Sequence, residues 1–194
     1  MPKRAIFIDK DGTLVENVPY NVDPARIRLM PGAVEGLRSL CRRGFVPIVV
    51  SNQPGVALGY FPPDALAGVE RRLRELLGAG GVALLACYFC PHAPANGNGS
   101  GCGCRKPAAG LLLRAALEHD IDLASSWMVG DILDDIEAGR AAGCRTVLVD
   151  NGGETEWRRG PSRTPHAVVN DLAAAARVIA LASGDGTVHE RRTI

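Results

Sequence analysis

The chain has 194 residues, of which 46% are hydrophobic and 22% are charged, and its formal net charge is +1. This composition is typical of one globular domain with a sizeable core. The small net charge argues against a nucleic-acid or acidic-membrane partner, and no apolar run approaches the ~20 residues that span a bilayer. The N-terminus leads directly into an apolar run too short for a signal peptide, so we expect a cytoplasmic protein.

Short apolar runs alternate with amphipathic segments along the chain. The runs that predict strands are 5–8, 46–50, 83–89, 127–129, 146–149 and 167–169. The segments with helical spacing lie between Pro31 and Gly44 and over 66–77, 108–118, 132–142 and 172–181. This alternation predicts an α/β fold with a doubly wound, mainly parallel sheet.

One domain over residues 1–182 accounts for all of these elements. The remaining residues, 183–194, are polar and predict a disordered tail. Two stretches, 16–30 and 90–105, are longer than ordinary connections, and long loops of this kind usually cover a site or determine specificity. We expect no large cap domain, because the predicted strands and helices are distributed over most of the 194 residues.

Polar side chains follow the predicted strands in turn. They are Asp9 and Asp11, then Ser51 and Asn52, then Lys106 after the loop behind the third strand, and Asp131. Each also has an ordinary interpretation when taken alone. Ser51 and Asn52 could form a turn, Asp131 could lie at a helix N-terminus, and Lys106 could be a solvated surface lysine. If the strands are parallel, however, all of these residues converge at one edge of the sheet.

The converging set suits phosphoryl transfer. Two carboxylates can hold a divalent cation and leave one oxygen free to attack an electrophile. A hydroxyl and an amide can donate to phosphate oxygens, and a lysine neutralises their charge.

A second cluster combines three cysteines and one histidine. Cys90 and His92 are followed, after nine residues, by Cys102 and Cys104, and three thiolates with one imidazole suit a tetrahedral structural Zn²⁺. The Gly- and Asn-rich segment between the pairs cannot form a core, so a metal would close the loop over 90–104. The alternative is a loose loop with unpaired thiols. Cys41, Cys87 and Cys144 lie in apolar patterns and are expected to be buried, inert thiols.

The motifs together resemble those of the haloacid dehalogenase (HAD) superfamily of phosphatases, over about residues 4–182. The zinc loop is similar to that of the branch, subfamily IIIA, that contains heptose 1,7-bisphosphate 7-phosphatases and histidinol-phosphate phosphatases. The motifs that carry the resemblance are Asp9-Lys10-Asp11-Gly12-Thr13, Ser51-Asn52-Gln53, Arg105-Lys106-Pro107 and Gly130-Asp131-Ile132-Leu133-Asp134-Asp135.

The resemblance implies a mechanism with an aspartyl-phosphate intermediate. Asp9 would be the nucleophile, and Asp11 would protonate the leaving alkoxide and then activate water. Mg²⁺ would be held by Asp9, the backbone carbonyl of Asp11, and Asp131.

The resemblance also implies how phosphate is bound. Ser51 and Lys106 would bind the transferring phosphoryl group, with Asn52 assisting. Arg105, a planar guanidinium, would contact a second anionic group. Asp135 would support Lys106 or the metal. The zinc ligands would be Cys90, His92, Cys102 and Cys104.

The substrate is expected to be a small sugar phosphate, with a heptose bisphosphate first, in a route to nucleotide-activated heptose and lipopolysaccharide. Histidinol phosphate or another small phosphomonoester is the alternative, because Leu58 and Pro54 stand where the heptose enzymes commonly have arginine and serine. Lys10, where arginine is common, is a milder departure.

Other classes of protein fit the motifs less well. A phospho-accepting receiver domain also has an aspartate at a strand end, but it would not want an acid/base group at Asp11. A zinc-stabilised binding module would not need the carboxylates and the lysine, and a DNA 3′-phosphatase is disfavoured by the charge. No amphipathic helix stands out as an interface, so we expect a monomer.

Overall fold

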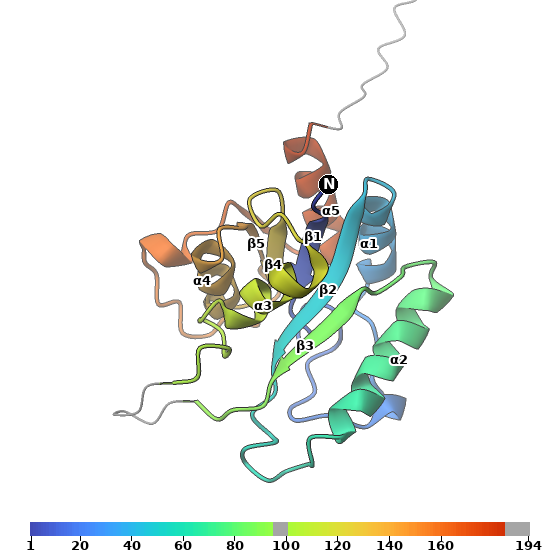
Figure 1. Ribbon diagram of the computed structural model, residues 1–194, viewed down its shortest axis with the longest axis vertical. Helices are drawn as coiled ribbons and strands as arrows, with labels where there is room; N and C mark the ends of the chain where they lie inside the picture. The colour runs from blue at the N-terminus through green and yellow to red at the C-terminus, as the bar shows by residue number, and fades with distance from the viewer. Residues whose placement is uncertain (95–100, 185–194) are drawn as a thin grey trace, which may run out of the picture.

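The computed structural model describes residues 1–94 and 101–184. Within these residues, six strands form one parallel sheet in the order β3-β2-β1-β4-β5-β6 (Figure 1). The strands are β1 (Arg4–Ile8), β2 (Phe45–Asn52), β3 (Ala86–Cys90), β4 (Trp127–Gly130), β5 (Arg145–Val149) and β6 (Ala167–Val169). The predicted parallel, doubly wound α/β fold is confirmed.

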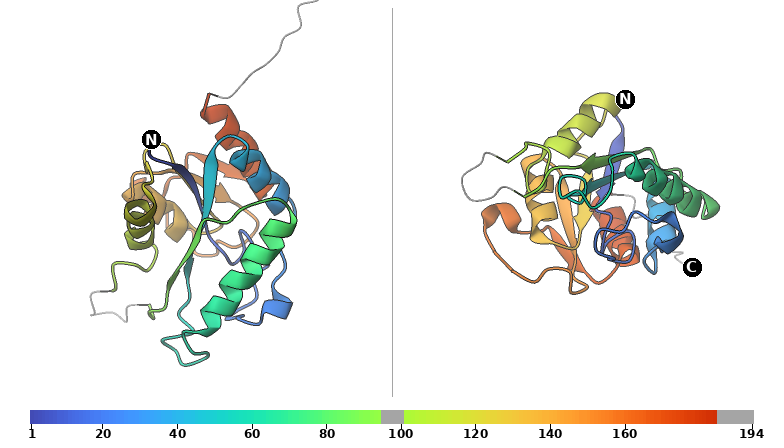
Figure 2. Two further views of the ribbon diagram at one scale, coloured as in Figure 1. Left: turned by 45° about the vertical axis from the view of Figure 1, so that its right-hand side comes forward. Right: turned by 90° about the horizontal axis from the view of Figure 1, so that it is seen from below.

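Helices cover both faces of the sheet (Figure 2). They are α1 (Ala33–Cys41), α2 (Ala65–Ala79), α3 (Gly110–His119), α4 (Leu133–Ala141) and α5 (Leu172–Ala182). Successive residues of β1 point to opposite faces: Ile6 and Ile8 pack with α1, α2 and α5, whereas Ala5 and Phe7 pack with α3 and α4. The central strand is therefore apolar on both sides, as is typical of a buried parallel sheet.

The third strand begins later than the sequence predicts. The apolar run starts at Ala83, but β3 starts at Ala86, where its pairing with Ile48 of β2 begins. The residue before Ile48 is Pro47, which has no N–H to donate and only accepts a hydrogen bond from Leu85 N at 2.9 Å. Leu84 still packs in the core, so the apolar signal reflected burial rather than a continuous ladder.

The two long loops connect the elements around one end of the sheet. The segment after β1 contains a short 3-10 helix, Pro24–Arg26, capped by Asp23. A second 3-10 helix, Pro161–Arg163, precedes β6. Residues 95–100 of the cysteine loop and residues 185–194 of the predicted tail lie outside the described residues.

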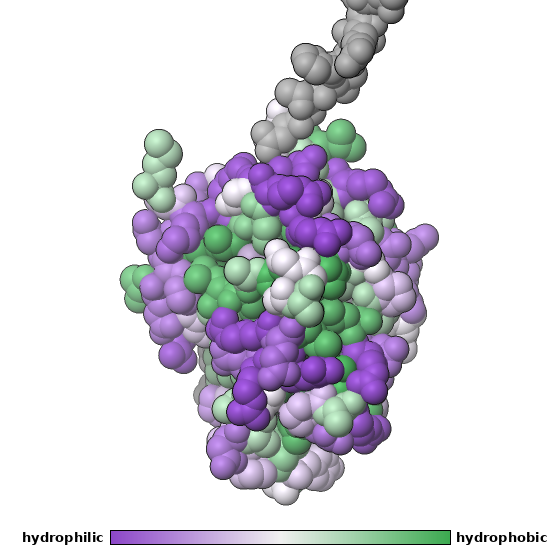
Figure 3. Space-filling model, turned by 90° about the vertical axis from the view of Figure 1, so that its right-hand side faces the viewer, coloured by the Kyte–Doolittle hydropathy of each residue, from purple (hydrophilic) through white to green (hydrophobic). Residues whose placement is uncertain are grey.

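Polar and hydrophobic residues are interspersed on the face that carries α2 (Figure 3). On this helix Arg74 pairs with Glu70 and Arg72 pairs with Glu75. Across the described ranges, every helix is too short or too polar to cross a bilayer.

Candidate active site

The carboxyl ends of three neighbouring strands meet at one end of the sheet. Ile8, the last residue of β1, pairs with Val49 of β2 and Val129 of β4. Asp9 therefore emerges between the ends of both neighbours. A cavity of about 250 Å³ opens there. Its lining residues are Asp9, Asp11, Asn17, Ser51, Asn52, Pro54, Arg105, Lys106, Asp131, Ile132, Asp134 and Gly153.

Lys106 is a buried cation at the centre of this arrangement. Its Nζ donates to Asp9 Oδ1 at 2.5 Å and to the Val50 carbonyl at 2.9 Å. It also lies 2.6 Å from Asp135 Oδ1, which has no other hydrogen-bond partner among the described residues. Burial opposes the charge of Lys106, but Asp135 and Asp9 outweigh it and raise the pKa of the lysine above its usual range. The site thus holds a permanent positive charge against Asp9.

Asn52 fixes the backbone of Lys106. Its Nδ2 donates to the Lys106 carbonyl and its Oδ1 accepts from the Lys106 N–H, both at 3.0 Å. The side-chain amide is therefore occupied by the peptide of Lys106 in this structure. Asn52 ties β2 to the segment that follows the cysteine loop, 54 residues away.

The carboxylate of Asp11 is held by two buried donors. Lys10 Nζ lies 2.5 Å from Asp11 Oδ1, and Gln53 Nε2 lies 3.0 Å from Asp11 Oδ2. The same Gln53 nitrogen donates to Ser51 Oγ at 3.0 Å. Burial raises the pKa of Asp11, while Lys10 opposes that shift. A raised pKa keeps a carboxyl protonated over a wider pH range, which suits a group that donates a proton.

Three acids gather tightly enough to share a cation. Asp9, Asp131 and Asp135 each place an oxygen within 4.8 Å of the others. Burial, and then the charge of Asp9, raise the pKa of Asp131 to about 7, because both disfavour the ionised form of the carboxyl. A set of hard oxygen donors fits Mg²⁺.

Two glycines shape the slot around Asp131. A Cβ on Gly12 would lie 2.2 Å from Asp131 Oδ2, and one on Gly153 would lie 2.0 Å from the same atom. Thr13 Oγ1 donates to the other oxygen, Oδ1, at 3.0 Å. Both loops therefore approach Asp131 too closely for any side chain at these glycines.

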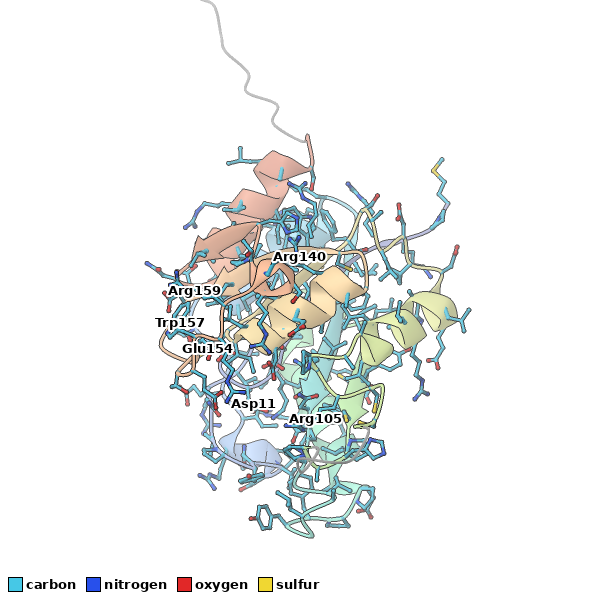
Figure 4. The ribbon with its side chains drawn as sticks, turned by 90° about the vertical axis from the view of Figure 1, so that its left-hand side faces the viewer. Asp11, Arg105, Arg140, Glu154, Trp157 and Arg159 are labelled. Carbon is cyan, nitrogen blue, oxygen red and sulfur yellow. The ribbon has the colours of Figure 1, made fainter. Side chains whose placement is uncertain are left out.

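The loop after β5 also contributes to the site. Asn151 Nδ2 donates to the Gly12 carbonyl at 2.6 Å, and Glu154 Oε2 accepts from Leu133 N at the start of α4 at 2.8 Å. Gly153 of this loop lines the cavity, and Figure 4 labels the next residue, Glu154, together with Asp11 and Arg105. The sequence argument missed this loop, although residues 150–154 also follow a strand and the same reasoning about strand ends applies to them.

The cysteine cluster lies next to the cavity. The Sγ atoms of Cys90, Cys102 and Cys104 are 3.3–3.5 Å apart, and His92 Nδ1 lies 3.3 Å from Cys104 Sγ and 3.5 Å from Cys90 Sγ. These four atoms could hold one metal ion. Arg105, which follows the cluster, lines the cavity and donates to the His92 carbonyl at 3.4 Å.

Comparisons with known proteins identify the family of the chain. A HAD-hydrolase-like family model matches residues 103–175. A D-glycero-D-manno-heptose-1,7-bisphosphate 7-phosphatase of Thermosynechococcus vestitus is 37% identical, over 92% of this chain and 96% of that protein. The chain belongs to the HAD-like phosphatase family.

Solved structures agree with this membership. A D,D-heptose 1,7-bisphosphate phosphatase of B. bronchiseptica, complexed with magnesium and phosphate, has a TM-score of 0.75 and 30% identity, over 92% of this phosphatase and 99% of that chain. A HAD-like phosphatase of Mesorhizobium loti has a TM-score of 0.73 and 34% identity, over 92% and 88%.

The structure brings together every phosphatase site residue that the sequence singled out. Asp9, Asp11, Ser51, Asn52, Arg105, Lys106 and Asp131 all line one cavity. The contacts of Gln53, Lys10 and Thr13 were not anticipated, although all three lie inside the motifs. Leu58, which stands where relatives commonly have arginine, is 44% exposed and lies outside the set of described residues that line the cavity.

The three other cysteines are apart from the site. Cys144 is buried, and Cys41 and Cys87 are half-buried. Burial raises the pKa of Cys87 and of Cys144 to about 12. These thiols are therefore held in their unreactive, protonated form.

Proposed function

We propose that this phosphatase removes the 7-phosphate of D-glycero-D-manno-heptose 1,7-bisphosphate in nucleotide-activated heptose biosynthesis. The observation that carries the proposal is the carboxylate of Asp9, held by Lys106 beside Asp11 and Asp131 in one cavity. The heptose bisphosphate phosphatases that the chain resembles over nine-tenths of its length supply the substrate.

The residues divide the reaction between them. Asp9 attacks phosphorus as the P–O bond to the sugar breaks, and Asp11 gives its proton to the leaving alkoxide. In the second half, Asp11 removes a proton from the water that attacks phosphorus and releases Asp9. Lys106 stabilises the charge on Asp9 and on the phosphoryl oxygens, and Ser51 donates to those oxygens.

We propose Mg²⁺ as the catalytic metal, held by Asp9, the backbone carbonyl of Asp11, and Asp131. When bound, it would neutralise the charge of the phosphoryl oxygens. The acidic oxygen donors around Asp131 support this assignment, as does the magnesium bound by the B. bronchiseptica enzyme.

We propose that Cys90, His92, Cys102 and Cys104 hold a structural Zn²⁺ with no open position. The soft thiolate set and the distances between ligand atoms support this metal. The role of the ion would be to fix Arg105 and Lys106 beside the cavity, where Arg105 would bind the second phosphate of the substrate.

We further propose a cytoplasmic monomer whose single domain ends with α5. None of the six cysteines, which all lie in the described residues, forms a disulfide, and this suits a reducing compartment. The partner is a small sugar phosphate rather than a nucleic acid or a membrane.

A second candidate is histidinol-phosphate phosphatase activity. Pro54 lines the cavity where the heptose enzymes commonly have serine, so the part of the site that contacts the sugar differs. The deciding measurement is Mg²⁺-dependent phosphate release from both anomers of the heptose bisphosphate and from histidinol phosphate. A hundredfold preference in kcat/KM for one heptose anomer, about 2.7 kcal/mol, would support the proposal, and a preference for histidinol phosphate would overturn the choice of substrate.

The nucleophile is tested by Asp9→Asn. The amide cannot form the acyl phosphate, so we expect turnover to be lost, measured as phosphate release. The matched control is Asp64→Asn on an exposed position before α2, which should leave turnover unchanged. Near-normal phosphate release from Asp9→Asn would remove Asp9 as the nucleophile. If the chain were a receiver-like domain instead, the wild type would form a long-lived phosphoaspartate at Asp9 and would release phosphate slowly.

A further inference from the structure

A second buried lysine, Lys10, lies beside Asp11, the second aspartate of the motif over residues 9–13. Lys10 is 1% exposed, and its ammonium has one hydrogen-bond partner among the described residues, Asp11 Oδ1 at 2.5 Å. A buried charge without a partner is strongly destabilising, so the Lys10 side chain depends on this contact. The two catalytic carboxylates are therefore held by two different lysines, Asp9 by Lys106 and Asp11 by Lys10.

Gln53 holds the other oxygen of the same carboxylate. It is 4% exposed, and its backbone N–H donates to the Cys90 carbonyl at 2.7 Å. Its side-chain nitrogen donates both to Asp11 Oδ2 and to Ser51 Oγ, each at 3.0 Å. One amide group thus sets the position of the proposed acid relative to the proposed phosphate ligand.

Lys10 and Gln53 both act toward Asp11 only as hydrogen-bond donors. An ammonium and an amide NH₂ donate hydrogen bonds but cannot accept a proton from a carboxylic acid. A carboxylate has about four lone-pair sites, and Lys10 and Gln53 each contact one oxygen. Asp11 also lines the cavity. Neither of these two side chains can take the proton of Asp11, so we expect it to be exchanged with groups in the cavity that Asp11 lines.

We propose that Lys10 and Gln53 are positioning residues that aim the Asp11 carboxyl at the leaving-group oxygen. The inference rests on the acid role of Asp11 in the proposed function. Loss of this alignment matters only where the leaving group needs a proton. A sugar alkoxide needs one, whereas p-nitrophenolate departs as an anion.

The test compares two substrates in one set of variants. We would measure kcat/KM for heptose bisphosphate and for p-nitrophenyl phosphate, because kcat/KM reports the steps up to departure of the leaving group. The variants are Lys10→Met, Lys10→Arg and Gln53→Met, with Lys3→Met as the matched control on an exposed lysine.

The ratio of the two kcat/KM values, sugar to aryl, decides the question. General acid catalysis contributes about 10²–10⁴-fold, so Lys10→Met and Gln53→Met should each lower the ratio at least tenfold. Lys10→Arg keeps the charge and should stay within about threefold of the wild type, and Lys3→Met should not change the ratio. A structural defect alone would lower both rates together.

An unchanged ratio in Lys10→Met or Gln53→Met would overturn the inference, as would a Lys10→Arg variant as defective as Lys10→Met. If Lys10→Met does not fold, the ratio for Gln53→Met decides. A wild type that splits p-nitrophenyl phosphate but not heptose bisphosphate contradicts the proposed substrate instead. The ratio is then taken with the sugar phosphate that the wild type hydrolyses fastest.

Discussion

Lys106 is 2% exposed and its charge is balanced by two carboxylates rather than by water. A buried ion pair contributes little net stability when complete, but removal of one partner leaves an uncompensated charge. If Lys106 binds phosphate as proposed, catalysis and folding depend on the same residue. The cation proposed to neutralise phosphate also lies against Asp9 and Asp135 in the folded state.

Replacement of Lys106 by methionine should lower the free energy of unfolding by about 3 kcal/mol, because it leaves two buried carboxylates together. Urea unfolding measures this change. The double variant Lys106→Met/Asp135→Asn should recover part of the loss, since the second change removes one of the two charges. Additive effects of the two substitutions would show that Asp135 and Lys106 are not coupled.

At the scale of elements, two loops from opposite parts of the chain close around Asp131. Residue 12 lies after β1 and residue 153 lies after β5, and each approaches Oδ2 of Asp131 through a glycine. The hydrogen bond from Asn151 to the Gly12 carbonyl joins the two loops. The position of the proposed metal ligand is therefore set by backbone packing rather than by its own strand alone.

Gly153→Ala tests this packing. The added methyl would overlap Asp131 Oδ2, so we expect the Mg²⁺ concentration for half-maximal activity to rise at least tenfold, and Mg²⁺ binding measured by calorimetry to weaken. Gly160→Ala is the matched control, because a Cβ there meets nothing within 4 Å. Equal Mg²⁺ dependence in the two variants would show that Asp131 tolerates displacement.

The cysteine loop provides a second test at this scale. Freshly purified wild type should contain about one equivalent of zinc, and Cys102→Ser should contain less than half of that, with a lower Tm, because the metal contributes to folding. Cys41→Ser, outside the cluster, should retain its zinc. A wild type with less than half an equivalent would argue against the zinc assignment.

At the scale of the whole molecule, the grouped carboxylates make stability depend on pH. Burial raises the pKa of Asp131 to about 7 and also raises that of Asp11. The folded protein therefore holds protons that the unfolded chain releases near pH 4. Because the folded state then binds more protons, stability falls as pH rises between about pH 4 and 7.

Urea unfolding in Mg²⁺-free buffer should show this fall, by up to about 1.4 kcal/mol per pH unit for one such group. Added Mg²⁺ should reduce the slope, since a bound cation favours the ionised carboxylates. Asp131→Asn should show a shallower decline than the wild type. A free energy of unfolding that rises with pH over this window would contradict the assignment.

The fold and the main site residues can be predicted from the sequence because both depend on patterns of neighbouring residues. Alternating apolar runs fix the strands and helices, and in a parallel sheet the residues after successive strands must meet at one edge. That argument places Asp9, Ser51 and Asp131 together without any knowledge of side-chain positions. The predicted start of β3 was wrong by three residues. Pro47 of β2 has no N–H to donate to β3, and the hydrophobic pattern of residues 83–89 does not show this.

The side-chain pairings were decided only by the tertiary structure. The sequence identifies two lysines and several acids within the motifs, but it cannot say that Lys106 binds Asp9 and Asp135 while Lys10 binds Asp11. It also gives no sign that the Asn52 side chain hydrogen-bonds the backbone of Lys106, or that Gly153 lies too close to Asp131 to carry a side chain. The longest of these contacts joins residues 97 positions apart, and the partners depend on packing and register rather than on local pattern.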